Sequence, residues 1–277
     1  MTKPLTTVKG ASGTYRVSKR LGGTEKFTLY QCQQDGTEAM HILKIATEAR
    51  FNGAIDREAF LLRDMRERAA ALEAEYAAVK KGPELLNYGI SFPILIETFI
   101  AKEQGRRRIM VMSFEGVTDI TKLVPMSHIT TRDRVYVDPR TSAWMLGKLL
   151  KLLIFAHDQG IVVGNLDGDN ILVERDQHYV VLFDWTTAVR YDSGIPPDVV
   201  GKEIAHAAQA VLRALGANPK TGALPESDQL NEGGYQAHLL QLITGKSKDA
   251  AHAHADFYGL IRGLWPRSYY PYTTNPL

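Results

Sequence analysis

The sequence is short of cysteine, of long apolar runs and of any excess of charge. Its one cysteine, Cys32, cannot form a disulfide within the chain, which favours a reducing compartment. No stretch approaches the roughly 20 apolar residues that a membrane-spanning helix needs, and the first ten residues lack the apolar centre of a secretion signal. The net charge of +2 gives no general reason to expect nucleic acid or membrane partners. We therefore predict a cytoplasmic protein without such partners.

The first half of the chain is predicted to be rich in strands. Hydrophobic residues make up 44% of the 277 residues and charged residues 23%, which suits one large domain or two joined lobes. The runs that are rich in β-branched and aromatic residues are residues 15–18, 27–32, 40–45, 92–102 and 108–114. Residues 55–80, rich in Ala, Glu, Arg and Leu, predict one long helix, stopped by Gly82-Pro83.

The second half of the chain is predicted to be mostly helical. Residues 141–159 are strongly apolar, as is typical of a buried helix. A tight polar loop at residues 164–170 is followed by a strand at 171–174 and by another strand that ends at Asp184. Helices are expected in most of the remainder. A strand-rich part followed by a helical part predicts an α+β arrangement with a ligand-holding cleft.

Several residues with useful chemistry occur in order along this pattern. Lys44 lies in the third of the strand-like runs. Glu58 lies on the long helix. The segment 160–173 contains the polar loop and closes on Asn170, and a later strand delivers Asp184. An amide oxygen and a carboxylate are ligands that suit Mg²⁺.

This order of motifs resembles the protein-kinase-like superfamily over nearly the whole chain. The resemblance implies an α+β, bilobal protein-kinase-like fold. A strand-rich N-lobe with one main helix would cover residues 1–115, and a mostly helical C-lobe would cover residues 116–277. The implied cofactors are ATP and Mg²⁺, held between the lobes.

The resemblance also implies a role for each matching residue. Lys44 would hold the α- and β-phosphates, and Glu58 would keep Lys44 extended. Asn170 and Asp184 would be the metal ligands. The candidate cofactor-binding residues are Gly22, Gly23, Lys44, Glu58, Ser113 and Glu115.

Departures from the family pattern bear most directly on catalysis. Five residues before Asn170, the family carries an aspartate that accepts or orients the substrate hydroxyl, but this chain has Asn165, whose amide cannot take a proton. Positioned proton transfer is worth about 10²–10⁴-fold. Asp167 stands where many protein kinases have a lysine near the γ-phosphate, and Gly164 replaces the arginine of the usual triplet. We name Asn165 and Asp167 as the catalytic positions.

The glycine-rich loop and the positions of Gly164 and Trp185 also depart from the pattern of ordinary protein kinases. Only Gly22 clearly fills a motif glycine, while Thr24 and Phe27 occupy the other two positions. Backbone contacts to phosphates should suffer as a result. Gly164 and Trp185, which directly follows Asp184, are similar to features of the aminoglycoside- and choline-kinase-like branch.

Three functions remain open on the sequence alone. The first is a pseudokinase that binds Mg-ATP and acts through a protein partner. The second is an active but atypical phosphotransferase or nucleotidyltransferase in which Asp167 or Asp169 assists. The third is an interaction module that has lost nucleotide binding, for which the eroded glycine loop is the best argument.

Three further features are noted without an assigned function. Glu203 occupies roughly the place of a structural acid in the helical lobe. Residues 116–140 form a long polar connection that could be a lid or a docking loop. The aromatic tail at residues 265–272 could pack on the helical lobe or on a partner.

Overall fold

The computed structural model describes residues 6–80, 86–117, 119–218, 220–225, 234–266 and 268–277. The chain divides into two compact units, Met1–Lys122 and Leu123–Leu277, called here the first and the second unit. The boundary predicted between residues 115 and 116 falls inside the first unit. The helix stop predicted at Gly82-Pro83 lies outside the described residues.

The first unit is built on a six-stranded sheet in which every neighbouring pair is antiparallel. The strand order is β1-β2-β3-β4-β6-β5, so the two last strands exchange places relative to the sequence. The strands are β1 (Thr7–Lys9), β2 (Thr14–Gly23), β3 (Phe27–Gln34), β4 (Met40–Ala46), β5 (Ile94–Ala101) and β6 (Arg107–Ser113). Short 3-10 helices occur at Ala49–Phe51, Gly89–Ser91, Lys102–Gln104 and Ile120–Lys122.

Alternation along β4 sends its side chains to two different environments. Leu43 and Ile45 point to one face, where they join a buried cluster with Tyr15 and Cys32. Lys44, between them in sequence, therefore points to the opposite face. The strand is buried on both faces, which explains why its sequence is apolar apart from His41 and Lys44.

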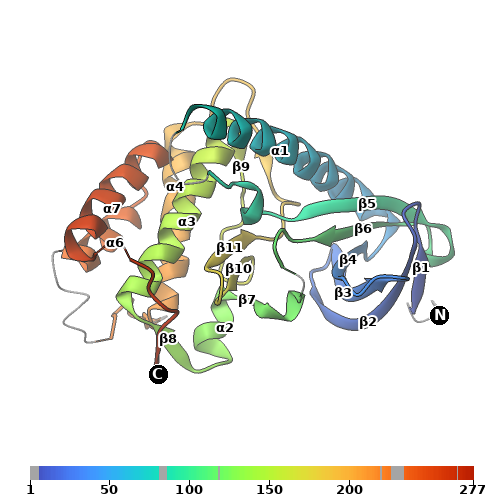
Figure 1. Ribbon diagram of the computed structural model, residues 1–277, viewed down its shortest axis with the longest axis horizontal. Helices are drawn as coiled ribbons and strands as arrows, with labels where there is room; N and C mark the ends of the chain where they lie inside the picture. Colours follow the sequence, from blue (N-terminus) through green and yellow to red (C-terminus); the bar gives the residue numbers. More distant parts are fainter. Residues whose placement is uncertain (1–5, 81–85, 118, 219, 226–233, 267) are drawn as a thin grey trace. The chain divides into compact units, whose positions relative to one another are not determined.

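One long helix, α1 (Asn52–Val79), packs against β5 and β6 (Figure 1). Its first turn is fastened to these strands because the Asn52 amide accepts from the Arg108 N–H at 2.7 Å and donates to the Arg106 carbonyl at 2.9 Å. Its buried residues include Ile55, Glu58 and Leu62, at helical spacing. The helix thus brings Glu58 against the face of the sheet to which Lys44 points.

The second unit is mostly helical, and α3 packs against both α4 and α7 (Figure 1). Asp138 caps α3 by accepting from the Thr141 N–H at 2.7 Å, and Pro139 occupies the first helical position, where its missing N–H costs nothing. The helices are α2 (Met126–Thr131), α3 (Pro139–Asp158), α4 (Pro197–Ala214), α6 (Tyr235–Leu242) and α7 (Ala250–Leu264).

Small sheets complete the second unit. A three-stranded sheet has the order β11-β10-β7, and two strand pairs join β12 to β9 and β13 to β8. The strands are β7 (Leu123–Pro125), β8 (Val135–Val137), β9 (Ile161–Val162), β10 (Ile171–Glu174), β11 (Tyr179–Leu182), β12 (Val189–Arg190) and β13 (Thr274–Pro276). The predicted α+β architecture, with a strand-rich part and a helical part, is confirmed.

The described residues of the 116–140 connection include short regular elements. Its β7 pairs with β10, and α2 buries Met126 and Ile129 and packs against α4. Sequence reasoning missed these elements because each is too short to show a period.

The described part of the tail at residues 265–272 contacts the start of α3. The Arg140 guanidinium donates to the Pro266 carbonyl at 2.9 Å, and the Tyr270 hydroxyl donates to the Asp138 carboxylate. Just beyond the tail, β13 pairs with β8.

Candidate functional site

In the first unit, Lys44 and Glu58 form a buried ion pair. The Lys44 ammonium lies 2.7 Å and 2.9 Å from the two carboxylate oxygens of Glu58, and both side chains are 0% exposed. The contact follows from the fold, because β4 sends Lys44 to the face on which α1 presents Glu58. Contacts to both carboxylate oxygens fix the position of the ammonium. A lysine that holds phosphates would need such a fixed position.

The predicted glycine-rich loop is a tight turn between β2 and β3. The Thr24 N–H donates to the Phe27 carbonyl at 2.8 Å, and the Lys26 N–H donates to the Thr24 hydroxyl at 3.1 Å. Gly23, at φ 148°, cannot be replaced, because an added Cβ would meet the Phe27 carbonyl oxygen at 2.4 Å. Gly22 has open space around it. Gly23 is therefore explained by the turn itself.

Phe27, at the third motif position, has an unexpected neighbour. The Lys44 nitrogen lies 3.9 Å from the centroid of the Phe27 ring. This is a cation–π contact at close range. The sequence motif marked Phe27 only as a missing glycine, and it gave no sign of this contact.

Ser113 and Glu115 lie at and just after the end of β6. Glu115 forms an ion pair with Arg66 of α1 at 2.6 Å, and both side chains are partly exposed. Gly89 lies so close to this pair that a Cβ there would meet the Arg66 guanidinium at 2.3 Å. The structure thus ties Glu115 to the helix, and its predicted contact with a nucleotide stays a prediction, as does that of Ser113.

In the second unit, the loop with the catalytic positions is held by its own side chains. One carboxylate oxygen of Asp167 accepts from the Asp169 N–H at 3.0 Å and from the Asn170 N–H at 2.9 Å. The Asn165 side-chain oxygen accepts from the Asp167 N–H at 3.3 Å. The Asp169 carboxylate accepts from the Ser127 hydroxyl of α2. Each of the three polar side chains is engaged in shaping the turn.

Asn170 joins this loop to Asp184, which lies two residues beyond the end of β11. Its side-chain nitrogen donates to the carbonyl oxygens of Asn165 at 2.9 Å and Asp184 at 3.0 Å, and its side-chain oxygen accepts from the Asp184 N–H at 2.6 Å. One oxygen of the Asp184 carboxylate accepts from the N–H and the hydroxyl of Thr186, at 3.1 Å and 2.8 Å. The structure brings the two predicted metal ligands together, as their spacing implied.

Glu203 anchors the start of the same loop. Its buried carboxylate accepts from the Gly164 N–H at 2.7 Å and the Val163 N–H at 3.1 Å, and lies 3.0 Å from His157 Nε2. Gly164 adopts φ 78°, and an added Cβ would meet the Thr187 carbonyl at 2.8 Å. The loop therefore requires glycine where the usual triplet has arginine.

The donor set fits Mg²⁺ in its chemistry. An amide oxygen has two lone pairs, so Asn170 can accept the Asp184 N–H and still face a cation. Asp184 adds a carboxylate, and hard oxygen ligands are those that Mg²⁺ prefers. Among the described residues, no group of three or more His, Cys, Asp or Glu side chains forms a separate metal site.

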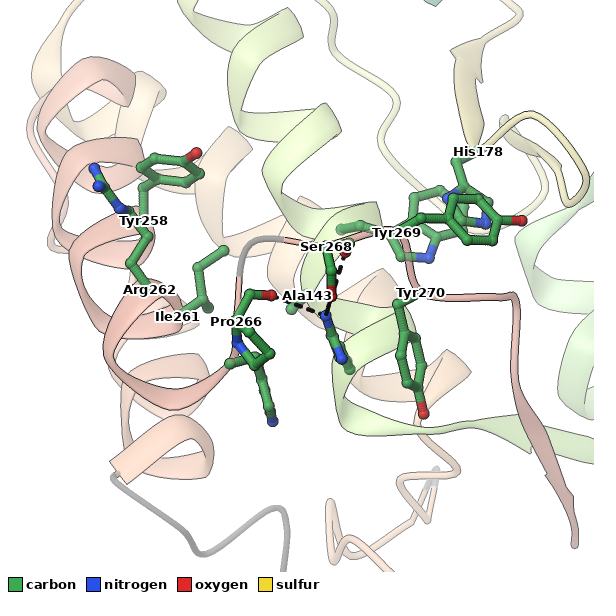
Figure 2. A pocket seen from close by; sticks show the side chains of 12 residues that line it. Ala143, His178, Tyr258, Ile261, Arg262, Pro266, Ser268, Tyr269 and Tyr270 are labelled. Carbon is green, nitrogen blue, oxygen red and sulfur yellow. Dashed lines mark hydrogen bonds between the residues drawn. The ribbon is translucent and has the colours of Figure 1, made fainter.

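A cavity of about 220 Å³ lies elsewhere in the second unit, among α3, α7 and the tail (Figure 2). At its edge His178 stacks between Trp144 and Tyr269, with ring centroids 4.7 Å and 5.0 Å apart. Burial lowers the pKa of the His178 imidazole. No predicted site residue lines this cavity.

Comparison with known proteins supports the fold assignment. No family model and no curated protein matches the sequence. The structure of vaccinia related kinase 3 matches with a TM-score of 0.57 and 17% identity, covering 94% of this chain and 90% of that one. A double mutant of the Mycobacterium tuberculosis PknI kinase domain matches with a TM-score of 0.55 and 12% identity, over 92% and 98%. The chain has a protein-kinase-like fold, as its motifs predicted. Across the described residues no helix is long and apolar enough to cross a membrane.

Proposed function

We propose that the protein is a pseudokinase that binds Mg-ATP, transfers phosphate poorly and acts through a protein partner in the cytoplasm. The Lys44–Glu58 pair carries this proposal, because both side chains are completely buried. Burying two charges costs free energy that their attraction need not recover, so such a pair is weak evidence for a role in stability alone. A requirement for a fixed ammonium accounts for its presence.

Lys44 of the first unit would serve the phosphates, and Asn170 and Asp184 of the second would hold Mg²⁺. The bound metal would neutralise phosphate charge. Asn165 supports the impaired chemistry, because an amide cannot accept the hydroxyl proton. Nucleotide binding would then favour one conformation, which the partner recognises.

The alternative of an active transferase has less support. Asp167 and Asp169 would have to replace the missing base, yet both carboxylates accept hydrogen bonds that shape the turn. A proton taken by either one would weaken those bonds. An interaction module without nucleotide is the stronger rival, because the Phe27 ring already contacts Lys44.

Thermal unfolding with ATP, in the presence and absence of Mg²⁺, tests the proposal. At about 100 times its dissociation constant, a ligand stabilises the protein by roughly 2.7 kcal/mol, which raises Tm by several degrees. We expect a Mg²⁺-dependent rise in the wild type that Asp184→Asn loses. This variant keeps a side-chain oxygen for Thr186 and removes the charge. The matched control is Asp192→Asn, at an exposed position. No rise at saturating Mg-ATP would leave the interaction module as the better account.

A further inference from the structure

The ammonium of Lys44 is enclosed by two different groups of the first unit. The Glu58 carboxylate lies on one side at 2.7 Å and 2.9 Å, and the Phe27 ring lies on another with its centroid at 3.9 Å. Neither the sequence nor the comparisons assign a role to Phe27.

The position of the ring follows from the register of the sheet. Leu29 pairs with Lys44 and Phe27 pairs with Ala46, so Phe27 and Lys44 are diagonal neighbours on one face of β3 and β4. Alternation sends Cys32, on β3, to the other face with the apolar cluster. Phe27 therefore belongs to the same face as the ion pair and not to that cluster.

The turn that carries Phe27 is fastened to the end of β4. The Thr47 N–H donates to the Lys26 carbonyl at 2.9 Å, and the Thr47 hydroxyl donates to the Glu25 carbonyl at 2.5 Å. The N–H groups of Thr24 and Lys26 are bonded within the turn. These contacts hold the ring over Lys44, and they also engage N–H groups that a phosphate-binding loop would offer.

We propose that the Phe27 ring competes with the phosphates of a nucleoside triphosphate for the Lys44 ammonium. This inference rests on the proposed function, in which Lys44 serves the phosphates. A glycine at this position would place no ring against the ammonium. In this chain the ring has to move away before the phosphates reach Lys44, so Phe27 lowers nucleotide affinity and couples binding to movement of the turn.

Equilibrium titration with a fluorescent ATP analogue and Mg²⁺ tests the competition. Phe27→Leu keeps an apolar side chain and removes the aromatic face. Pentafluorophenylalanine at position 27 keeps the ring shape and reverses its quadrupole, so it covers the case in which Phe27→Leu folds poorly. We expect both to lower the dissociation constant by about 10-fold, since a desolvated cation–π contact is worth that much or more. Phe99→Leu, on the face of the apolar cluster, is the matched control and should leave the constant unchanged.

Proton NMR gives a second measurement that requires no assumption about turnover. The Lys44 methylene protons next to the nitrogen should resonate upfield in the wild type because of the ring current of Phe27. They should return to ordinary values in Phe27→Leu and in the wild type with saturating Mg-ATP.

The outcomes separate this inference from the proposed function. Equal dissociation constants for the wild type and both Phe27 variants overturn the competition and leave nucleotide binding intact. Binding by the variants but not by the wild type supports the competition strongly. An absence of binding in all of these proteins overturns nucleotide binding, and the competition with it.

Discussion

The two regions that supply the predicted nucleotide contacts are stabilised in different ways. In the first unit, Lys44 and Glu58 form an ion pair in which both side chains are completely buried. In the second unit the loop that contains Asn165 is held by many hydrogen bonds, in which side chains bind backbone groups a few residues away. A pair of opposite charges stabilises the region around Lys44, whereas several side-chain-to-backbone hydrogen bonds stabilise the loop around Asn165.

This difference explains how asparagine could replace the catalytic base at position 165 while the loop keeps its hydrogen bonds. The carbonyl of residue 165 accepts from Asn170 whatever the side chain is, and the Asn165 amide oxygen still accepts from the Asp167 N–H. An asparagine thus fits the scaffold as well as an aspartate would. Lys44 is less tolerant of replacement, because removal of either charge of the pair takes away a close contact of a completely buried charged group.

The largest expected effect is therefore on the ion pair. Lys44→Met should lower the free energy of unfolding by about 3–5 kcal/mol, because the buried Glu58 carboxylate loses the Lys44 ammonium. Chemical denaturation measures this loss. The double variant Lys44→Met, Glu58→Leu should recover much of the lost stability.

The matched control is an exposed pair of the same unit. Arg16 and Asp35 lie 2.7 Å apart with side chains 66% and 49% exposed, so Arg16→Met should cost less than about 1 kcal/mol. Similar losses in Arg16→Met and Lys44→Met would contradict the contrast between the two regions.

A smaller loss is expected where the hydrogen-bonded loop begins. Glu203→Ala leaves the N–H groups of Val163, which is buried, and of Gly164 without their acceptor, and should cost about 2–3 kcal/mol. Hydrogen exchange at these two amides should speed up more than elsewhere in the second unit. Asp198→Ala, in an exposed pair on the same helix, is the control. Unchanged exchange at Val163 and Gly164 would remove Glu203 from its anchoring role.

The smallest effect concerns Asp133, which lies between α2 and β8 and pairs with Arg175 in the turn between β10 and β11. Hydrogen bonds from Arg132 and then Arg175 lower the pKa of Asp133 from 3.8 to about 2. Because the folded pKa is lowered, this stabilisation is complete above pH 4 and is lost as the pH falls toward 2. Asp133→Asn should reduce stability by about 1 kcal/mol at pH 7, given the partial exposure of these groups, and by almost nothing near pH 2. A difference that stays constant over this range would contradict the assignment.

Much of the fold could be predicted from the sequence because its main elements are long or strongly patterned. The strands around Lys44, the helix with Glu58 and the apolar helix α3 all lie where the patterns placed them, within a few residues. The spacing of Asn170 and Asp184 predicted their proximity, because a short strand pair between them returns the chain to the loop.

The features that were missed depend on contacts between distant parts of the sequence. Ser127 donates to Asp169 across 42 positions, and nothing near either residue signals the bond. Phe27 is a further example, because its ring meets Lys44 only after β3 and β4 have paired in register. Short elements such as α2 have no period long enough to detect.

The most direct test of the account is a single-turnover experiment with ATP labelled on the γ-phosphate. Filter binding and quenching of the same sample give the fraction of nucleotide bound and the fraction cleaved. We expect the wild type to retain intact ATP. We expect Asn165→Asp to bind ATP equally well and to cleave it about 100-fold faster or more. Equal cleavage rates in the two proteins, or rates of about 1–100 per second in the wild type, which are typical of kinases, would contradict it.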